Sequence, residues 1–299
     1  MEQLNNGTMN TILSIIILSY NTADITTACI KSIFANYKKE IDDKTLEVII
    51  VDNASTDNSL SAILNLQFTI FNGRKRFKII QNKKNVGFAK GCNLGAKNAQ
   101  GKYLLFLNSD TQASDKGFLQ MIEFLEKNKN IGVLGGKLLN PDGTSQASGG
   151  NFYNLWNLFI MLLGGERLGL VRKEAIKKES VDWVSGACMM IRKELFEKLN
   201  GFDEYFFMYI EDMELCFRVK KLGFEIYFYP DIRLFHKMLG SSNRKFAIMN
   251  IYKGILYFYR KQMPFWQYQA AKLMLACKAG VLASLGNKTY EKSFSYCRE

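Results

Sequence analysis

Four apolar runs without polar alternation occur in the first 110 residues of the chain, at 11–20, 46–51, 77–81 and 103–107. A run of this kind, when turn residues bound it, predicts a strand that is buried on both faces, as in a parallel sheet covered by helices. The intervening segments 24–38, 59–66 and 88–99 carry apolar residues at helical spacing. Strands that alternate with helices predict a parallel α/β sheet with right-handed crossovers.

The chain up to residue 237 predicts further elements of both kinds. We expect a helix at 115–128, strands at 131–139 and 183–192, and a helix from Glu211 to a stop near Gly223. Two short strands, 225–229 and 232–235, are expected ahead of His236. The apolar segment 149–169 is flanked by glycines and is too short to span a bilayer, so it predicts a flap or an interfacial patch.

The composition is that of a chain that can bury a large core, with 299 residues of which 47% are apolar. Its six cysteines are scattered, with no CxxC pair and no secretory signal, which favours free thiols in a reducing, cytosolic compartment. Neither the polar segment 1–10 nor the apolar run 12–18 approaches the roughly 20 residues of a membrane-spanning helix. We therefore expect no segment to cross a bilayer.

The net charge of +12 is concentrated near the carboxyl end, where residues 237–299 hold eleven Lys and Arg residues against two acids. Because the rest of the chain is nearly balanced, no general nucleic-acid surface is expected. A basic amphipathic helix is predicted from apolar residues at three- and four-residue spacing, which are Tyr252, Ile255, Leu256, Tyr259, Met263 and Trp266. We expect this helix to lie on an anionic membrane surface. Packing on the body of the protein and a homodimer contact are the alternatives.

Polar residues end three of the predicted strands. They are Ser19 and Tyr20 after the first strand, Asp52 and Asn53 after the second, and Asn108, Ser109 and Asp110 after the run at 103–107. The carboxyl ends of parallel strands meet at one edge of the sheet, where open α/β sheets bind ligands. We therefore expect these three turns to converge on a binding site.

Three glycines, Gly87, Gly91 and Gly95, surround the start of the helix predicted at 88–99. With exposed amides and the nearby Lys90 they could face a phosphate, or they could let the helix pack closely on the sheet. The segment matches neither the dinucleotide fingerprint nor the P-loop. The local pattern favours packing.

Glu211 and Asp212 lie in the first turn of a predicted helix, behind an aromatic segment. Acids in that position complement the helix dipole, which explains one acid more readily than a pair. His236 is the only histidine in the chain and follows an apolar strand. A lone histidine is more often structural than a ligand, so the residues alone leave its role open.

Six ordered features resemble the inverting family 2 glycosyltransferases, particularly their rhamnosyltransferase-like branch. They are SIIILSYN, VDNASTDNS, NVGFAKGCNLG, YLLFLNSDT, WVSGACMMIRKELFEKLNGFDEYFFMYIEDMELCFR and the closing His236, and they run from about residue 12 to residue 242. The resemblance implies a GT-A fold, a nucleoside-diphosphate-sugar donor and a divalent metal. We expect a GT-A domain at 1–240, with a nucleotide-sugar-binding half at 11–112 and an acceptor half at 113–240, and then a helical extension at 241–299.

The resemblance also implies roles for individual residues. The nucleotide would contact Ser19, Tyr20, Asp52, Asn53, Asn85, Gly87, Asn108 and Ser109. The sugars would contact Trp183 and Gly186, the metal would bind Asp110 and His236, Asp212 would be the general base, and Glu211 would lie near donor or acceptor hydroxyls. Asn108 stands at the first acidic position of the family's DXD-like motif, so the metal is assigned to Asp110. A departure is Lys90-Gly91-Cys92-Asn93, where relatives carry Gly-Gly-Asn-Asn.

The predicted activity is a metal-dependent, inverting transfer of a sugar, with rhamnose favoured, from a dTDP- or UDP-sugar to a hydroxyl of a cell-surface glycan or lipid-linked saccharide. Such a displacement needs a base for the acceptor proton and a metal for the charge on the leaving diphosphate. A carboxylate with an imidazole suits Mn²⁺ or Mg²⁺. The expected location is the cytoplasmic face of the plasma membrane. A nucleotidyltransferase and a non-catalytic sugar-nucleotide-binding protein are the alternatives.

Overall fold

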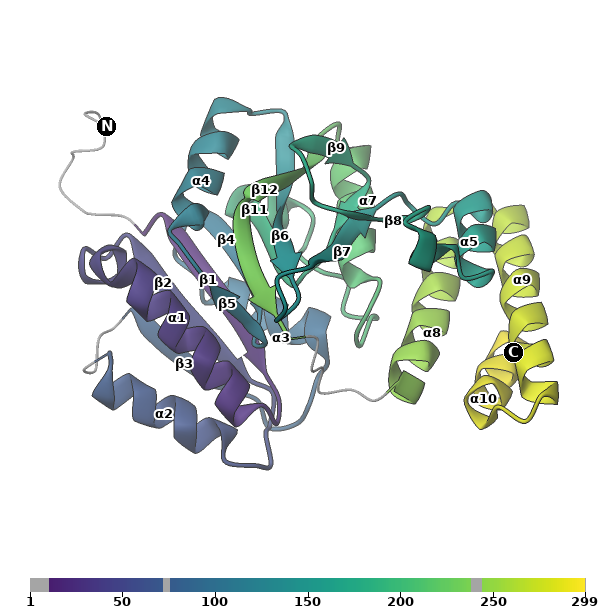
Figure 1. The fold of residues 1–299 in the computed structure, drawn as a ribbon, viewed down its shortest axis with the longest axis horizontal. Helices are drawn as coiled ribbons and strands as arrows, with labels where there is room; N and C mark the ends of the chain where they lie inside the picture. Colours follow the sequence, from purple (N-terminus) through teal and green to yellow (C-terminus); the bar gives the residue numbers. More distant parts are fainter. Residues whose placement is uncertain (1–10, 72–75, 238–243, 299) are drawn as a thin grey trace.

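The computed structural model describes residues 11–71, 76–237 and 244–298. The polar segment 1–10 and the domain boundary expected at 240 lie outside these ranges. A mixed sheet forms the centre of the molecule, helices cover its faces, and three C-terminal helices lie together at one end (Figure 1). This α/β architecture with a C-terminal helical extension confirms the fold class predicted from the sequence.

The first half of the chain forms the expected parallel part of the sheet, in the order β4-β1-β2-β3. Its strands are β1 (Leu13–Ser19), β2 (Leu46–Asp52), β3 (Phe77–Gln81) and β4 (Tyr103–Asn108). The helices that connect them are α1 (Ala23–Asp42), α2 (Ser59–Thr69) and α3 (Phe88–Lys97).

Alternate residues of β1 pack into opposite layers. Ile15 and Ile17 belong to one core cluster, together with Ile30 of α1. Ile16 belongs to the other cluster, together with Cys92 of α3. Since helices cover both faces of the strand, apolar side chains are needed on both, which explains the absence of polar alternation.

The second half of the chain adds strands of mixed direction. β11 (Cys188–Arg192) runs antiparallel to β4 and to β6 (Ile131–Leu139), whereas β12 (Glu225–His236) runs parallel to β6. The shorter strands are β5 (Thr111–Ala113), β7 (Ser145–Gly150), β8 (Arg172–Glu174), β9 (Glu179–Val181) and β10 (Trp183–Val184). The helices are α4 (Gly117–Lys127), α5 (Leu155–Leu162), η1 (Gly165–Leu168), α6 (Lys193–Lys198) and α7 (Glu211–Lys221).

Two strand predictions are wrong in detail. Residues 183–192 form two strands, β10 and β11, because the chain leaves the sheet between them and the Gly186 N–H donates to the Asp212 carboxylate (3.0 Å). The two short strands expected at 225–235 are one strand, β12, whose register shifts between Tyr229 and Arg233. Pro230 lies at this shift and has no N–H for the ladder, so the irregularity lets the strand continue past it.

The C-terminal extension consists of α8 (Arg244–Gln262), α9 (Phe265–Ser284) and α10 (Lys288–Arg298). Four of the apolar residues expected to face a membrane are buried in a core cluster, namely Tyr252, Ile255, Leu256 and Tyr259. The Tyr259 hydroxyl donates to the Tyr153 carbonyl (2.6 Å) ahead of α5. The expectation that these four side chains contact a bilayer is therefore wrong, since protein covers the face of α8 that carries them.

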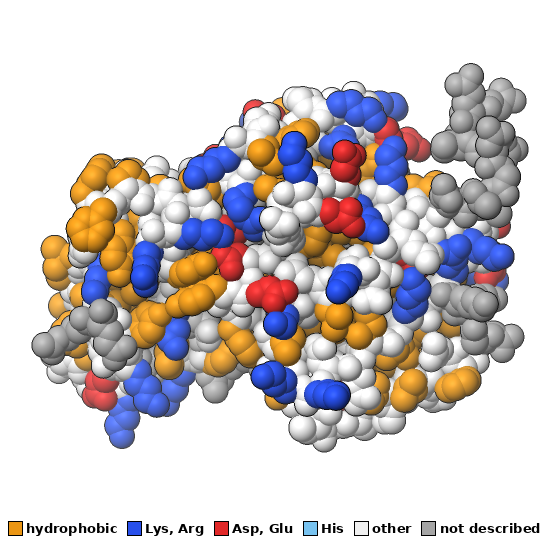
Figure 2. Space-filling view, turned by 180° about the vertical axis from the view of Figure 1, so that it is seen from behind, with side chains coloured by type: hydrophobic (Ala, Val, Ile, Leu, Met, Phe, Trp, Pro, Cys, Tyr) orange, Lys and Arg blue, Asp and Glu red, His pale blue; other side chains and the backbone are white. Residues whose placement is uncertain are grey.

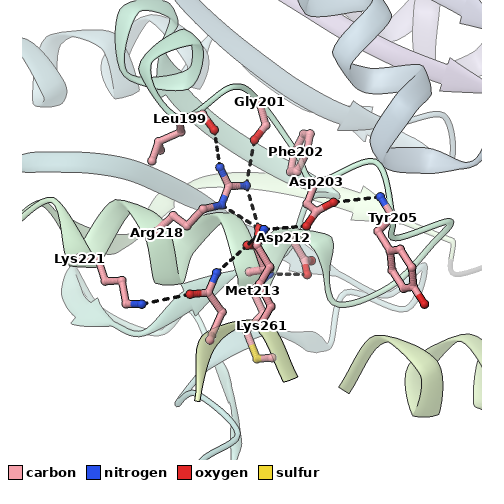
Figure 3. Close-up of polar contacts among 12 residues, drawn as sticks. Leu199, Gly201, Phe202, Asp203, Tyr205, Asp212, Met213, Arg218, Lys221 and Lys261 are labelled. Carbon is pink, nitrogen blue, oxygen red and sulfur yellow. Dashed lines mark hydrogen bonds and ion pairs between the residues drawn. The ribbon is translucent and has the colours of Figure 1, made fainter. Parts of the chain in front are cut away.

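A buried ionic network joins α8 to α7 (Figure 3). Glu214 of α7 is fully buried and accepts hydrogen bonds from Arg218 Nε and Lys261 Nζ, both at 2.8 Å. Gln262 Nε2 donates to the same carboxylate at 2.9 Å. Lys261 also contacts Asp203 (2.6 Å), in the loop that precedes α7. The network therefore fixes α8 against both α7 and the loop before it.

The six cysteines are free thiols, as their scattered spacing predicts. Five of them are buried, and Cys277 on α9 is exposed. None of the helices in the described ranges is long and apolar enough to cross a membrane.

Replacing Glu214 with Gln should lower the free energy of unfolding by about 3 kcal/mol, because Arg218 and Lys261 would keep their charges without the buried carboxylate that balances them. Urea unfolding at neutral pH measures the change. The matched control is Glu204→Gln, which removes an exposed ion pair with Lys90 and should cost less than about 1 kcal/mol. Equal losses in the two variants would contradict a stabilising role for the buried network.

Candidate active site

A cavity of about 650 Å³ lies at the carboxyl ends of β1 and β4 and reaches the start of α7. It collects most of the residues singled out from the sequence. Those that line it are Tyr20, Asn53, Asn85, Gly87, Asn108, Ser109, Asp110, Trp183, Gly186, Glu211, Asp212 and His236.

The three polar turns converge at one edge of the sheet, as predicted. Ser19 lies opposite Asp52 in the ladder, and Leu18 lies opposite Asn108. The side chains of Ser19 and Asp52 do not line the cavity. Ser19 Oγ is buried beside Thr26 Oγ1 (3.0 Å), whereas the buried Oδ1 of Asp52 has no hydrogen-bond partner among the described residues. The structure therefore places these two residues behind the cavity wall.

Asn53 organises the loop 82–87 beside the cavity. Its Nδ2 donates to Asn85 Oδ1 (2.8 Å), and its Oδ1 accepts from the Val86 N–H (3.1 Å). Gly87 has a φ of +85°, and a Cβ there would lie 2.3 Å from the Phe207 carbonyl oxygen. Only glycine fits this position, because a side chain would push the loop away from the segment that leads into α7.

The glycines of α3 serve helix-to-sheet packing. A Cβ at Gly91 would lie 2.4 Å from Leu18 Cδ1, and a Cβ at Gly95 would lie 2.5 Å from Ile16 Cγ2. Both contacts are with β1, in agreement with the favoured interpretation of the sequence. Lys90 forms an exposed ion pair with Glu204 (3.0 Å) and is not part of the cavity wall.

Asp110 and His236 bring together two side chains with metal-ligating chemistry. Asp110 lies between β4 and β5, and His236 ends β12 where that strand pairs with β5. Asp110 Oδ1 lies 3.1 Å from His236 Nε2, and Asn108 Nδ2 lies 3.5 Å from the same nitrogen. The pairing of β5 with β12 is therefore what places the two ligand candidates side by side.

Gln146 of β7 sets the tautomer of His236. Its Nε2 donates to Asn140 Oδ1 and to the His236 carbonyl, both at 2.7 Å, so its Oε1 faces His236 Nδ1 at 2.8 Å. Because Oε1 can only accept, Nδ1 is the nitrogen that donates to Gln146, and Nε2 is directed toward Asp110. A metal-ligating imidazole needs this arrangement.

The pair fits a divalent cation of the Mn²⁺ or Mg²⁺ class. A carboxylate and an imidazole supply oxygen and nitrogen ligands, a mixture that favours Mn²⁺ over Mg²⁺. Within the described ranges, no three Asp, Glu, His or Cys side chains gather in a way that could hold a metal ion. The remaining ligand positions would therefore be filled by phosphate oxygens and water.

Glu211 and Asp212 begin α7 in contrasting environments. Asp212 accepts two backbone hydrogen bonds, from Gly186 N–H to Oδ2 (3.0 Å) and from Met213 N–H to Oδ1 (2.8 Å). Glu211 is only 5% exposed, and its Oε2 is buried without a hydrogen-bond partner in the described part of the chain. The break between β10 and β11 therefore supplies one of the two donors that hold Asp212.

These environments separate the two carboxyls chemically. Burial, followed by the charge of Asp212, raises the pKa of Glu211 well above its usual range. Burial also raises the pKa of Asp212, but the amides of Gly186 and Met213 and the charge of Arg172 oppose that rise. Of the two carboxyls, Asp212 is therefore the one whose charged form is stabilised by hydrogen bonds and by a nearby cation.

A strained turn precedes the two acids. Tyr209 has a φ of +72° and Ile210 a φ of +73°. For a residue other than glycine, a left-handed backbone conformation costs on the order of 1–3 kcal/mol. Gly254 of α8 packs on the turn, since a Cβ there would lie 2.9 Å from Ile210 Cγ1 and 3.3 Å from the Tyr209 carbonyl oxygen. The packing of α8 thus holds the turn that presents Glu211 and Asp212.

Gln146 and Arg172 are site residues that the sequence did not reveal. Arg172, at the start of β8, lines the cavity, and its Cζ lies 5.5 Å from the centre of the Trp183 ring. Both residues lie in short strands without apolar periodicity. No local pattern marks such positions, because the long-range pairing of the strands brings them to the site.

The sequence profile of the family named glycosyl transferase family 2 matches residues 14–200 of the chain. The chain belongs to this family. A second profile, of the N-terminal domain of galactosyltransferase, matches residues 170–240 of the family 2 chain. The two matches together span the strand ends that carry Asp110 and His236 and the helix start that carries Asp212.

Two relatives indicate the branch of the family. The family 2 chain is 31% identical over 166 residues to the O-antigen biosynthesis protein RfbC of Myxococcus xanthus. This alignment covers 52% of this chain and 12% of that protein. It is 23% identical over 227 residues to the N-acetylglucosaminyl-diphospho-decaprenol L-rhamnosyltransferase of Mycobacterium tuberculosis. This alignment covers 68% of this chain and 70% of that protein. The resemblance to the rhamnosyltransferase-like branch is thereby confirmed.

A solved structure has the same fold. The mannosyltransferase PcManGT from Pyrobaculum calidifontis, in complex with GDP-Man and Mn²⁺, superposes with a TM-score of 0.61 at 16% identity. The match covers 97% of this family 2 chain and 84% of that chain. At this identity the likeness concerns the fold alone, and it confirms the GT-A fold.

Replacing Gln146 with Leu should weaken the binding of Mn²⁺ together with a nucleoside diphosphate roughly 10- to 100-fold, because His236 would lose the acceptor that orients its ring. Isothermal calorimetry measures the affinity. The control is Ser145→Ala on the same strand, since the Ser145 hydroxyl has no hydrogen-bond partner within the described ranges. An unchanged affinity in Gln146→Leu would show that the orientation of His236 does not depend on this amide.

Proposed function

We propose that this family 2 protein is a metal-dependent, inverting glycosyltransferase. It moves a sugar, with rhamnose favoured, from a dTDP- or UDP-sugar to a hydroxyl of a lipid-linked saccharide or cell-surface glycan. The observation that carries the proposal is one cavity lined by both the Asp110–His236 pair and the amide-held Asp212. The mycobacterial relative, whose name specifies an L-rhamnosyltransferase and a diphospho-decaprenol acceptor, supports the choice of sugar and acceptor.

Asp212 acts as the general base. It takes the proton of the acceptor hydroxyl while the oxygen attacks the anomeric carbon of the donor sugar. The bond from that carbon to the diphosphate oxygen breaks, and its electron pair leaves with the nucleoside diphosphate. Attack opposite to the leaving group inverts the configuration. Glu211 lies near a hydroxyl of the donor or the acceptor.

The other residues of the cavity bind and orient the two substrates. Asp110 and His236 would hold Mn²⁺ or Mg²⁺, which stabilises negative charge on the departing diphosphate. The residues assigned to the nucleotide by the family resemblance, among them Tyr20 and Asn53, line the same cavity. Trp183 and Gly186 line the same cavity, where Gly186 donates to Asp212, and both would contact the sugars.

The alternatives are less well supported. A nucleotidyltransferase would need a glycine-rich basic loop after β1 to hold a triphosphate, and the chain has Ser19-Tyr20-Asn21-Thr22 there. A non-catalytic binding protein would gain nothing from a strained turn that fixes Asp212 on two amides. Membership of the glycosyltransferase family favours sugar transfer over both.

An anionic membrane surface is the proposed partner of α5 and α9. Trp266, one of the residues assigned to the membrane from the sequence, is exposed on α9, whereas the four buried side chains of α8 are excluded. Large apolar side chains are exposed on or beside these helices, namely Trp156, Phe159, Leu163, Phe265, Trp266, Leu273, Val281 and Leu285. Lys278 Nζ of α9 donates to the Leu162 carbonyl at the end of α5 (2.6 Å), so the two helices form one surface. Hydrophobic side chains gather at this end of the molecule (Figure 2).

The charge of this surface matches an anionic bilayer. α9 contains no acidic residue, and Lys288 and Lys292 are exposed on α10. Figure 2 shows Lys and Arg side chains beside the hydrophobic ones at this end. Each basic residue near anionic headgroups contributes about 1 kcal/mol. We therefore place the protein on the inner face of the plasma membrane, where a lipid-linked acceptor would be presented.

The two acidic roles should separate in variants. With Mn²⁺, dTDP-rhamnose and an N-acetylglucosaminyl diphosphate lipid, Asp212→Asn should transfer sugar roughly 100- to 10,000-fold more slowly than the parent protein while still binding dTDP. Asp110→Asn should instead weaken Mn²⁺-dependent binding of dTDP, because it removes a metal ligand. A transfer assay and calorimetry measure the two effects, with Asp142→Asn, in an exposed turn, as the control.

Two results would contradict these assignments. If Asp212→Asn loses dTDP affinity as severely as Asp110→Asn, or transfers sugar at nearly the parent rate, then Asp212 is not the base and Glu211 becomes the candidate. If the parent protein turns over no dTDP-, UDP- or GDP-sugar with either metal, the proposed activity is wrong.

Membrane binding should depend on α9. The double variant Trp266→Gln with Leu273→Gln should bind phosphatidylglycerol vesicles roughly 10- to 100-fold more weakly in a sedimentation assay, because two large apolar contacts are lost. Phe68→Gln, at an equally exposed apolar residue on α2, is the control. Equal binding by the double variant and the parent protein would refute a bilayer contact through α9. Light scattering without vesicles tests the homodimer contact that the sequence left open.

A further inference from the structure

We infer that Arg172 binds a phosphate group of the acceptor, and that the acceptor is therefore a saccharide joined through a phosphate or diphosphate to an apolar chain. The inference rests on the proposed function and adds to it a residue that determines acceptor specificity. It concerns the side of the cavity next to Asp212, for which neither the sequence motifs nor the metal pair provides a cation.

Arg172 is the one Lys or Arg among the described residues that line the cavity. The acids of the same wall are Asp110, Glu211 and Asp212. A divalent cation at Asp110 and His236 would balance the donor diphosphate. A phosphorylated acceptor would bring further negative charge, and Arg172 is the described side chain that could meet it.

The guanidinium of Arg172 is positioned but not satisfied. Its Cζ lies 5.5 Å from the centre of the Trp183 ring, so its plane is supported by an aromatic side chain and not by a carboxylate. Its Nε is buried and has no hydrogen-bond partner among the described residues. Because this nitrogen is buried, an oxygen-rich ligand in the cavity would pair with the terminal nitrogens of the guanidinium fork.

The location of Arg172 assigns the phosphate to the acceptor. Arg172 lies over the ring of Trp183, three residues before Gly186, whose N–H donates to Asp212, so Arg172 and Asp212 line neighbouring parts of one cavity. The charge of Arg172 accordingly lowers the pKa of Asp212 against the effect of burial. A molecule whose hydroxyl reaches Asp212 can therefore place a second group at Arg172. The donor diphosphate, in contrast, must lie at Asp110 and His236 if a metal is to stabilise it.

Side chains of α5 and of the segment before it line the cavity together with Arg172. Tyr153, just ahead of α5, and Met161, on α5, line the same cavity. Trp156 and Phe159 of that helix are exposed and stack with ring centres 6.1 Å apart. α5 therefore presents apolar side chains both to the cavity and to the outer surface that it shares with α9. A chain attached to a phosphate at Arg172 could follow this helix toward a bilayer, which a free sugar phosphate would not require.

Two acceptors that differ in the presence of the diphosphate test the inference. One is N-acetylglucosaminyl farnesyl diphosphate, and the other is the neutral farnesyl N-acetylglucosaminide. Arg172→Gln should raise KM for the diphosphate acceptor roughly 10- to 100-fold with a much smaller change in kcat, and should thereby remove the preference over the neutral acceptor. Arg172→Lys should restore part of the preference, because it keeps the charge and loses the bidentate fork. Lys173→Gln, the next residue of β8, does not line the cavity and is the control.

Binding measured without a donor decides the inference independently of catalysis. Calorimetry of the diphosphate acceptor should show the same loss in Arg172→Gln, while dTDP with Mn²⁺ should bind as it does to the parent protein. Equal losses for both acceptors would assign Arg172 to the support of Asp212 and Trp183. A fall in dTDP affinity would place it on the donor diphosphate. If the parent protein transfers no sugar, the proposed function is refuted. The role of Arg172 is still decided in that case, because acceptor binding is measured separately.

Discussion

The turn at Tyr209 and Ile210 forces the chain through two consecutive left-handed residues, neither of them glycine, immediately before α7 begins. Such a turn persists only where the surroundings hold it. Here Gly254 lets α8 approach the turn closely, and the Glu214 network anchors α8 to the helix that the turn starts. The orientation of the first turn of α7, and with it the carboxylate of Asp212, depends on this packing.

The break between β10 and β11 works together with the turn. If residues 183–192 formed one unbroken strand, the N–H of Gly186 would be directed into the sheet, and Asp212 would lose a donor. Instead the break in the sheet supplies a donor to Asp212, while α8 packs on the turn that precedes it. On the other wall, β5 and β12 bring Asp110 to His236, and Gln146 fixes the histidine ring. Asp212 and the Asp110–His236 pair are thus positioned by separate parts of the fold.

The sequence predicted the features that arise from local patterns or ordered motifs. Unbroken apolar runs identified β1, β2 and β4 because helices cover both faces of those strands. The family motifs identified Asp110, Asp212 and His236, which the structure places in one cavity. Gln146 and Arg172 escaped prediction because each lies in a short strand whose partners are distant in the chain. The amphipathic pattern of α8 was recognised, but amphipathicity alone cannot distinguish a bilayer from the body of the same protein.

The contacts of α8 also bear on how the molecule opens. Lys261 and Gln262 reach the carboxylate of Glu214, and Tyr259 is hydrogen-bonded to the segment ahead of α5. A fluctuation that detaches α8 must therefore expose a buried charge and release the turn before α7 at the same time. Segments linked in this way open as a single cooperative unit, with one free energy of opening for all of their amides. In this protein α8 and the turn before α7 should share that unit, so that any influence that loosens α8 will also loosen the carboxylate of Asp212.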